Sequence, residues 1–390
     1  MLPPIPASSR PVLVRAEGCH VWDRHGRRYL DATSGAFCVN LGYTRPDLVE
    51  VMRRAAERLP FARASMFESE ESEAYRAELL AAVGPPFTQV VLTGSGSEAV
   101  DVAIKLAIAY QRAAGCAERV EIRSLAGHYH GATLGALEVT GWEERRAPYA
   151  AALGPRLDGL PAAGDARSAA FIAETIPVAG LGVEVPAPGE LAARRAACDA
   201  AGALWIADEV LTGFGRCGAM FAWQRLEGSA AVPDLVVFGK GAGAGFAALA
   251  GVLVSARVAG ALNSAAAAGV SRFTHYQTYG GSPIACAVGR AVLRALREEG
   301  WMARARDLEA LLRAAIGPER APRAVGALAG FTSLHGAGDY AAAGLLVHSA
   351  EDPARAVAPP FTIDEGGHQE LSQLLSAVDG RACRQDRSSQ

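Results

Sequence analysis

The chain is poor in lysine. Its 390 residues include 38 lysines and arginines, and only two of these, Lys105 and Lys240, are lysines. Arginine can replace lysine wherever only positive charge is needed, but its guanidinium stays protonated and does not form a Schiff base. A lysine that persists in so arginine-rich a chain is therefore a candidate for chemistry that needs an amine.

Other missing features exclude whole classes of protein. The seven cysteines are scattered without a CxxC pair, which disfavours a disulfide framework and a structural zinc site. A net charge of −3 indicates neither a nucleic-acid partner nor an anionic membrane surface. No apolar run is long enough to span a bilayer, and residues 1–10 lack the pattern of a secretion signal. Because half of its residues are hydrophobic, we expect a globular protein. The lack of a signal, of a spanning segment and of a metal-binding pattern leads us to expect a cytoplasmic protein without a metal site.

Short apolar segments alternate with helical ones along most of the chain. We expect strands at 89–92, 119–123, 169–173, 204–207 and 235–238, and helices at 47–59, 70–83, 189–201 and 282–299. This alternation predicts an open, mainly parallel α/β sheet. A β-hairpin is expected at 18–31, and a smaller α+β region after residue 299.

Two polar residues follow predicted strands. Asp208 ends an apolar strand, and ligand groups gather at the carboxyl ends of parallel strands. This aspartate either pairs with a protonated ring nitrogen or serves as a helix cap or metal ligand. Lys240 stands between two glycines, which leaves room for a ligand at its amine; a solvated surface charge is the alternative. Lys105, inside a predicted helix, fits a surface role.

Three further motifs lie at strand ends or helix starts. The Gly/Ser loop at 93–99 runs into a long helix, an arrangement that binds phosphate through free N–H groups but that also precedes many ordinary helices. Tyr129 is suited to stack on a flat ring, whereas His128 and His130 lack a third metal ligand at a suitable spacing. Thr278 lies shortly before a predicted helix. Either its hydroxyl donates to a phosphate, or the segment is an ordinary turn that starts the helix.

Together these motifs resemble the class III aminotransferases, the ornithine-, γ-aminobutyrate- and ω-amino-acid-type enzymes of fold type I, which use pyridoxal 5′-phosphate (PLP). The resemblance covers nearly the whole chain and is most specific in the stretches IADEVLTGFGRCG, PDLVVFGKG and TYGGSP. It implies a large α/β domain with a mainly parallel seven-stranded sheet flanked by helices, plus a smaller α+β domain. We therefore expect an N-terminal segment at 1–55 that joins the small domain, a PLP-binding domain at 56–290 and the small domain at 291–390.

The family's catalytic residues transfer to matching positions. The resemblance implies that Lys240 holds PLP as a Schiff base and shuttles the substrate's proton. Asp208 would pair with the pyridine nitrogen. Tyr129 would stack on one face of the ring and Val210 would pack on the other. Lys240, Asp208 and Tyr129 are thus the expected catalytic residues.

The remaining cofactor contacts follow from the same resemblance. The backbone of Gly96 and Ser97 would hold the phosphate, and His130 and Glu174 are expected near the cofactor. Thr278 would reach the phosphate in the neighbouring subunit, which implies a homodimer with shared active sites.

Three positions depart from the family's pattern. Cys217 replaces a threonine that is common in the family, and Ala179 replaces the gating glutamate of ornithine-type members. Ala356 stands where many members place an arginine for the substrate's α-carboxylate, and Arg355 lies one residue out of register. These departures raise the prospect of an unusual substrate.

We predict that the protein transfers an amino group from an amino acid or amine to a keto acid, ketone or aldehyde. Phe37, Cys38 and Tyr43 are expected to contact these small molecules. The departures keep open another PLP reaction on an amino acid: decarboxylation, epimerisation, aminomutase chemistry or γ-elimination with carbon–carbon bond formation, in specialised metabolism for example. A non-catalytic protein of the same fold would be expected to lose Lys240 or Asp208.

Overall fold

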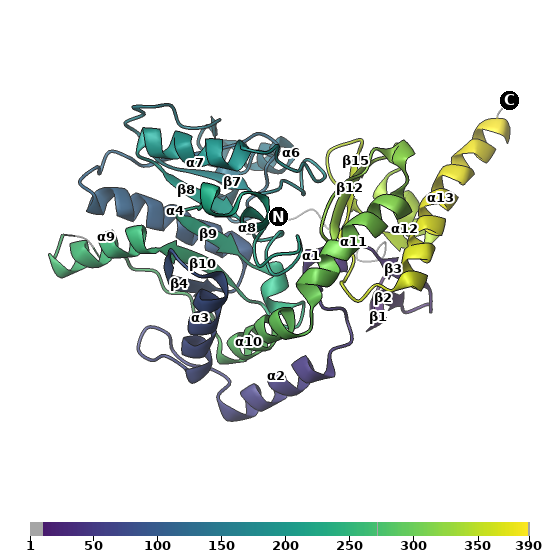
Figure 1. Cartoon of the computed structure of the whole chain (residues 1–390), viewed down its shortest axis with the longest axis horizontal. Helices are drawn as coiled ribbons and strands as arrows, with labels where there is room; N and C mark the ends of the chain where they lie inside the picture. Colours follow the sequence, from purple (N-terminus) through teal and green to yellow (C-terminus); the bar gives the residue numbers. More distant parts are fainter. Residues whose placement is uncertain (1–10, 271, 389–390) are drawn as a thin grey trace.

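A computed structural model describes residues 11–270 and 272–388 of the chain. Residues 1–10, which show no secretion signal in the sequence, and the last two residues of the predicted small domain lie outside this part. Figure 1 shows a larger body around one sheet and, beside it, a smaller body with two sheets and the last helices. None of the described helices combines the length and the apolar character needed to cross a membrane.

The larger body is built on seven strands. These are β4 (Phe87–Thr93), β5 (Glu121–Ser124), β6 (Leu157–Asp158), β7 (Ser168–Glu174), β8 (Leu204–Asp208), β9 (Leu235–Phe238) and β10 (Ala250–Ser255). They follow the order β4-β10-β9-β8-β7-β5-β6, in which β10 is antiparallel to both neighbours and all other pairs are parallel. The prediction of a mainly parallel seven-stranded α/β sheet is confirmed.

Strand boundaries differ from the predicted ones where backbone groups find other partners. β5 begins two residues later than expected because the N–H groups of Val120 and Glu121 both donate to the carbonyl of Arg167. The sequence reasoning missed β6, which has only two residues, and β10, which follows a run rich in glycine and alanine.

The larger body also contains helices and short 3-10 turns. They are α2 (Pro46–Arg58), α3 (Glu70–Val83), α4 (Gly96–Ala113), α5 (Leu134–Val139), α6 (Glu143–Arg146), η1 (Ala147–Ala152), α7 (Glu190–Ala201), α8 (Ala222–Leu226), η2 (Gly228–Ala231), η3 (Lys240–Gly243), α9 (Ala256–Ala267) and α10 (Pro283–Glu298). Ser69 and Ser72 form a capping box at the start of α3. The hydroxyl of Ser69 accepts from the N–H of Ser72 at 3.1 Å, and the hydroxyl of Ser72 accepts from the N–H of Ser69 at 3.2 Å. The first residue of α10 is a proline, which suits its first turn.

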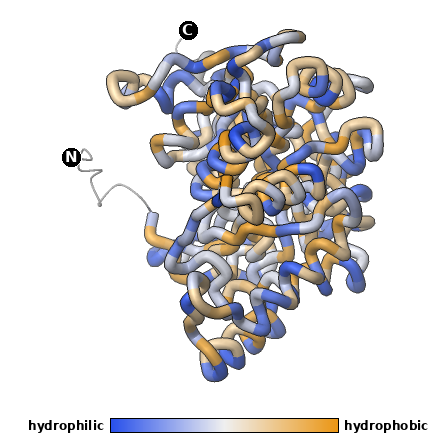
Figure 2. Tube along the Cα trace, turned by 90° about the vertical axis from the view of Figure 1, so that its left-hand side faces the viewer, coloured by the Kyte–Doolittle hydropathy of each residue, from blue (hydrophilic) through white to orange (hydrophobic). Residues whose placement is uncertain are grey.

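Successive side chains of the central strands alternate between two hydrophobic cores. Ile172 and Ile206 pack in the core that contains α4, whereas Phe171 and Trp205 pack in the core on the opposite face. Both faces of the sheet are buried, as continuous apolar runs predict for parallel strands covered by helices. Figure 2 shows that hydrophobic and hydrophilic residues also follow one another closely within single stretches of the trace, as helices with one buried side require.

The smaller body contains two four-stranded sheets. Their strands are β1 (Leu13–Glu17), β2 (His20–Asp23), β3 (Arg28–Asp31), β11 (Arg323–Val325), β12 (Leu328–Thr332), β13 (Leu345–Leu346), β14 (His348–Ser349) and β15 (Ala354–Val357), in the orders β1-β2-β3-β13 and β11-β12-β15-β14. The helices are α1 (Ser34–Phe37), α11 (Trp301–Ile316), η4 (Pro318–Arg320), α12 (Ala337–Ala343) and α13 (Glu365–Ser388). Because β13 pairs with β3, the N-terminal hairpin shares a sheet with the C-terminal part of the chain. The predicted domain boundaries at 55 and 290 remain a proposal.

Candidate cofactor and substrate site

Two adjoining cavities lie beside the carboxyl ends of the parallel strands. The inner cavity has a volume of about 200 Å³ and the outer cavity about 570 Å³. Both are lined by Lys240, Tyr129 and Leu211, so that they meet at the lysine. A group attached to this amine would therefore lie between the two spaces.

The inner cavity gathers most of the residues that the sequence singled out. Its lining includes eight of the nine predicted cofactor contacts: Gly96, Ser97, Tyr129, His130, Glu174, Asp208, Val210 and Lys240. They come from the start of α4, the loop after β5, the ends of β7 and β8, and the turn after β9. The ninth, Thr278, is exposed and is not among the residues that line either cavity.

Asp208 is held by two donors at the end of β8. His130 Nδ1 lies 2.8 Å from Asp208 Oδ2, and the N–H of Val210 donates to Asp208 Oδ1 at 3.0 Å. Both members of the pair are buried, and His130 Nε2 has no partner within the described structure. The histidine therefore fixes the direction of the carboxylate and holds its negative charge at the cavity wall.

The next residue, Glu209, points the other way and has a structural role. It is buried and accepts from the N–H groups of Ala222 and Trp223, each at 2.9 Å, at the start of α8. Burial raises the pKa of this carboxyl. Of the two adjacent acids, only Asp208 faces the cavity.

Glu174 lies next to Asp208 across the β7–β8 ladder. Its two oxygens accept from the N–H groups of Tyr129 at 2.9 Å and Val178 at 3.3 Å. Burial, and then repulsion by Asp208, raises the pKa of this carboxyl to about 7. Glu174 thus fixes the backbone of Tyr129 and titrates near neutral pH.

The two histidines beside Tyr129 serve different partners and do not form a metal pair. His128 Nδ1 accepts from the N–H of Glu174 at 3.0 Å, while His130 faces Asp208. Burial lowers the pKa of His128, which keeps its imidazole neutral. The metal site considered from the sequence is therefore not supported by the side-chain partners of these two histidines.

The start of α4 presents bare backbone to the inner cavity. A Cβ on Gly96 would lie 2.8 Å from Val210 Cγ1, so only glycine leaves room there. Ser95 caps the helix, with its hydroxyl accepting from the N–H of Glu98 at 3.3 Å. The Ser97 hydroxyl accepts from the N–H of Ala132 at 3.0 Å and ties the loop after β5 to this helix start.

Lys240 occupies a strained position in the turn after β9. Its φ of 43° lies in the left-handed region, which costs a non-glycine residue on the order of 1 kcal/mol and recurs at functional sites. Its Nζ lies 5.7 Å from the centroid of the Phe37 ring. Burial lowers the pKa of this amine, and Asp208 only partly opposes the shift.

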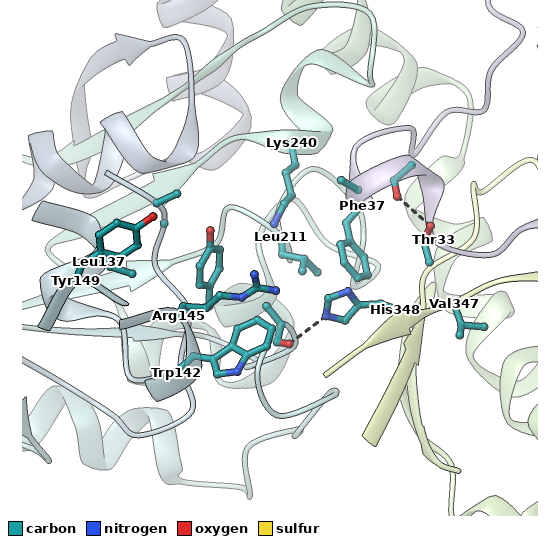
Figure 3. Close-up of a pocket in the computed structure, with 16 residues that line it drawn as sticks. Thr33, Phe37, Leu137, Trp142, Arg145, Tyr149, Leu211, Lys240, Val347 and His348 are labelled. Carbon is teal, nitrogen blue, oxygen red and sulfur yellow. Dashed lines mark hydrogen bonds between the residues drawn. The ribbon is translucent and has the colours of Figure 1, made fainter. Parts of the chain in front are cut away.

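The outer cavity is lined largely by residues that the sequence reasoning missed. Figure 3 shows Arg145, Trp142 and His348 around it, with Lys240 and Arg145 both directed into the space. His348 Nε2 donates to the carbonyl of Ala179 at 3.0 Å, and its ring meets Phe37 edge-on. No local motif marks these residues, because α6 and β14 approach each other only in the folded chain.

A close backbone approach holds Trp142 in place. A Cβ on Gly141 would lie 1.9 Å from the carbonyl oxygen of Leu125, so a side chain is excluded there. The N–H of Gly141 donates to the carbonyl of His128 at 2.7 Å, and the N–H of Gly127 donates to the carbonyl of Gly141 at 2.9 Å. Trp142 consequently meets the Tyr129 ring edge-on, with 6.0 Å between centroids.

Arg355 does not reach either cavity. Its Nε donates to the carbonyl of His335 at 2.8 Å and its Nη2 pairs with Asp352 at 2.6 Å. Because side chains alternate along β15, it is Ala356 that packs in the core with Phe37. The shift of one residue in the sequence thus removes this arginine from the site.

Two of the three residues expected to contact the substrate are not among those that line the outer cavity. Of Phe37, Cys38 and Tyr43, only Phe37 lines the outer cavity. The hydroxyl of Tyr43 donates to Asp31 Oδ2 at 2.6 Å, and Cys38 Sγ lies 3.4 Å from the carbonyl of Ala36.

Lys105, the other lysine, is exposed on α4, as expected. Its Nζ lies 3.1 Å from His275 Nδ1 and donates to the carbonyl of Thr274 at 3.3 Å. It therefore anchors the segment that leads to Thr278 and stays away from both cavities.

Comparisons with known proteins agree with this geometry. The family model described as "Aminotransferase class-III" matches residues 6–168 and 151–378. An omega-aminotransferase of Caulobacter vibrioides is 34% identical over 328 residues, covering 76% of this chain and 73% of that protein. An acetylornithine aminotransferase of Agrobacterium fabrum is 31% identical over 395 residues, covering 95% of this chain and 94% of that protein.

Solved structures show the same fold. An (S)-enantioselective omega-transaminase from Thermomicrobium roseum superposes with a TM-score of 0.85 and 30% identity, over 95% of this chain and 93% of that chain. A thermostable omega-transaminase mutant from Pseudomonas jessenii superposes with a TM-score of 0.88 at 24% identity, over 95% of this chain and 93% of that chain.

Proposed function

Since the chain belongs to the class III aminotransferase family and is thus a PLP-dependent aminotransferase, we propose that Lys240 carries the cofactor and moves the proton during amino transfer. One observation carries this assignment: a single amine, Lys240, stands where the two cavities meet. The other lysine is engaged elsewhere on the surface.

The inner cavity has the features that PLP requires. A buried carboxylate, an aromatic ring and the bare start of an 18-residue helix surround one space, and these suit a pyridine nitrogen, a flat ring and a phosphate. The residues that would hold the group are Asp208 at the ring nitrogen, Tyr129 and Val210 at the ring faces, and Gly96 and Ser97 at the phosphate. PLP, when bound, supplies an electrophilic carbonyl and a ring that withdraws electrons from the amine-bearing carbon.

The protein's own groups then have distinct tasks. Lys240, whose pKa burial lowers, is the amine that attacks a carbonyl and later takes a proton from the substrate's Cα. Asp208, held by His130, keeps a ring nitrogen protonated through its negative charge. Glu174 supports Tyr129 through a backbone bond.

The rarity of lysine makes a direct test possible. We expect the purified protein with PLP to show a visible absorbance band that an amino donor bleaches and pyruvate restores. Borohydride reduction followed by peptide mapping should place the cofactor on the peptide that contains Lys240 and not on that of Lys105. Lys240→Ala should lower turnover by at least about 1,000-fold.

Two outcomes would contradict parts of this assignment. A label on Lys105, or a fully active Lys240→Ala enzyme, would refute the role of Lys240. A band that donors leave unchanged or convert into a lasting carbanion-like band would instead indicate another PLP reaction, such as decarboxylation or epimerisation.

We further propose that the protein is a homodimer with shared active sites. Large apolar side chains are exposed at 61–67 and 276–279, among them Phe67 and Tyr279, each about two-thirds exposed (64% and 70%). Phe61 and Tyr279 already meet edge-on, so the two segments form one apolar surface. Thr278 lies on this surface, outside both cavities of its own chain, and a second copy seated there would bring it towards the partner's inner cavity.

Light scattering and cofactor titration test the shared site. We expect a dimer in solution, and Thr278→Ala should weaken PLP affinity by about tenfold, because a hydroxyl bond to a charged group is lost. Hybrid dimers of Lys240→Ala and Thr278→Ala subunits should regain wild-type affinity in the one site that keeps both residues. A monomer, or unchanged affinity in Thr278→Ala, would refute the proposal.

The position within the family and the cellular location are also proposals. The names of the relatives, omega-aminotransferase and acetylornithine aminotransferase, support the group of ornithine-, γ-aminobutyrate- and ω-amino-acid-type enzymes. A cytoplasmic location is proposed from the sequence alone.

A further inference from the structure

The outer cavity contains one arginine and no acid. Arg145 lines it beside Lys240 and His348, and the described residues of its lining include neither aspartate nor glutamate. Position 179, a glutamate in ornithine-type relatives, is an alanine whose carbonyl accepts from His348. A second ammonium group on a diamine substrate would meet no opposite charge here, whereas an anion would be attracted.

The fold leaves Arg145 uncommitted, in contrast to its neighbour. Arg146 is buried, and its guanidinium donates to the carbonyls of Leu137 at 2.7 Å and Gly154 at 3.1 Å. Arg145 has a ring contact only: its guanidinium carbon lies 4.5 Å from the centroid of Trp142. Within the part of the chain that the structure describes, no carboxylate or carbonyl pairs with it.

The position of Arg145 suits recognition of a carboxylate. Figure 3 shows its guanidinium turned into the cavity that Lys240 also enters, so both ends of one small molecule can be held. A guanidinium over an indole face keeps its planar N–H donors available, and these match the two oxygens of a carboxylate. Trp142 is itself fixed by the backbone contacts of Gly141, so the arginine rests on a rigid surface.

We propose that Arg145 binds a carboxylate of the substrate, and that this enzyme therefore prefers amino acids and keto acids to simple amines and ketones. Arg145 takes the role that the family's usual arginine cannot take here, since Ala356 occupies that position and Arg355 is turned away. The proposal names the substrate class of the proposed amino transfer at Lys240 and rests on it.

Matched pairs of donors test the preference. The reaction of the PLP-loaded enzyme with β-alanine and propylamine, 4-aminobutanoate and butylamine, and 5-aminopentanoate and pentylamine is followed through the loss of the visible band. For the best pair, wild type should favour the carboxylate donor by at least about tenfold in kcat/KM. Arg145→Gln should reduce this preference by about tenfold to a hundredfold, because a charge-assisted bidentate bond is lost, while the rate with the neutral amine stays within a few-fold.

Two further variants separate charge from structure. Arg145→Lys should restore part of the preference, because it keeps the charge without the planar fork. Arg112→Gln, which removes the same charge at the exposed end of α4, should behave like wild type.

Binding without turnover distinguishes the two proposals. Calorimetry of PLP-loaded protein with pentanoate, which has no amine, should show binding that Arg145→Gln weakens by at least about tenfold and that Arg112→Gln leaves unchanged. If no donor reacts but pentanoate binds through Arg145, the amino transfer fails and the carboxylate site stands. Equal pentanoate binding by wild type and Arg145→Gln, or a wild-type preference for neutral amines, would overturn the carboxylate site.

Discussion

The two cavities that meet at Lys240 are built by opposite means. The inner cavity is acidic, and its charged groups are buried and paired, as Asp208 with His130 shows. The outer cavity has no acid among its described lining, and its cation Arg145 rests on a ring without an ionic partner. A fixed charge suits a cofactor that stays bound, whereas an uncommitted charge suits a substrate that must enter and leave.

This difference predicts how substitutions on each side will act. A change in the inner cavity should slow the chemistry of every donor equally. A change in the outer cavity should alter the choice among donors and leave the chemistry of neutral amines intact.

The largest effect is expected for Asp208→Asn. The amide keeps the shape of the side chain but removes the negative charge that stabilises a protonated ring nitrogen, so kcat should fall on the order of a hundredfold to a thousandfold. The loss should be the same for 4-aminobutanoate and butylamine in steady-state assays, and borohydride should still fix PLP on Lys240. A loss confined to one of the two donors would erase the distinction between the cavities.

An intermediate effect is expected from the titration of Glu174. Its folded-state pKa of about 7 lies above its ordinary value of 4.5, so the folded protein binds this proton more tightly than the unfolded chain does. The stability of the protein without PLP should therefore fall as the pH rises from about 4.5 to about 7, by at most about 3.4 kcal/mol.

Urea unfolding at pH 5 to 8 measures this slope. The stability of Glu174→Gln should vary less with pH, because its amide does not titrate in this range. Glu118→Gln, in the exposed turn after α4, is the matched control and should keep the wild-type slope. If the stability of all three proteins had the same pH dependence, the folded protein would not raise the pKa of Glu174.

The smallest effect is expected for Trp142→Phe in the outer cavity. A phenyl ring supports a cation less well than an indole, by about 0.5–1 kcal/mol, so the KM for 4-aminobutanoate should rise about twofold to fivefold. The kinetics of butylamine should not change. A fall in kcat with both donors would assign Trp142 to the chemistry.

The inner cavity was largely predictable because its residues follow strands. An apolar run that ends in a polar residue places that residue at the carboxyl edge of the sheet, and this holds for Asp208 and, after β9, for Lys240. The functions of these residues stay predictions, but their convergence on one cavity is what their spacing and the family resemblance imply.

The outer cavity was not predictable, for two physical reasons. His348 and Arg145 are brought together by the packing of distant elements, and no local pattern records that contact. In addition, whether Arg355 or Ala356 faces the site depends on the register of β15 against β14 and β12, and a shift of one residue reverses the facing of every side chain.

The sequence by itself therefore determined the α/β sheet, the family and the lysine that stands apart from 36 arginines, because hydrophobic periodicity and short motifs are local properties of the chain. Only the tertiary structure decided that Arg145 lines the outer cavity without an ionic partner among the described residues. Arg145 and Arg146 are adjacent in sequence, yet Arg146 donates to backbone carbonyls whereas Arg145 is directed into the cavity. This difference depends on where the surrounding carbonyls lie after folding.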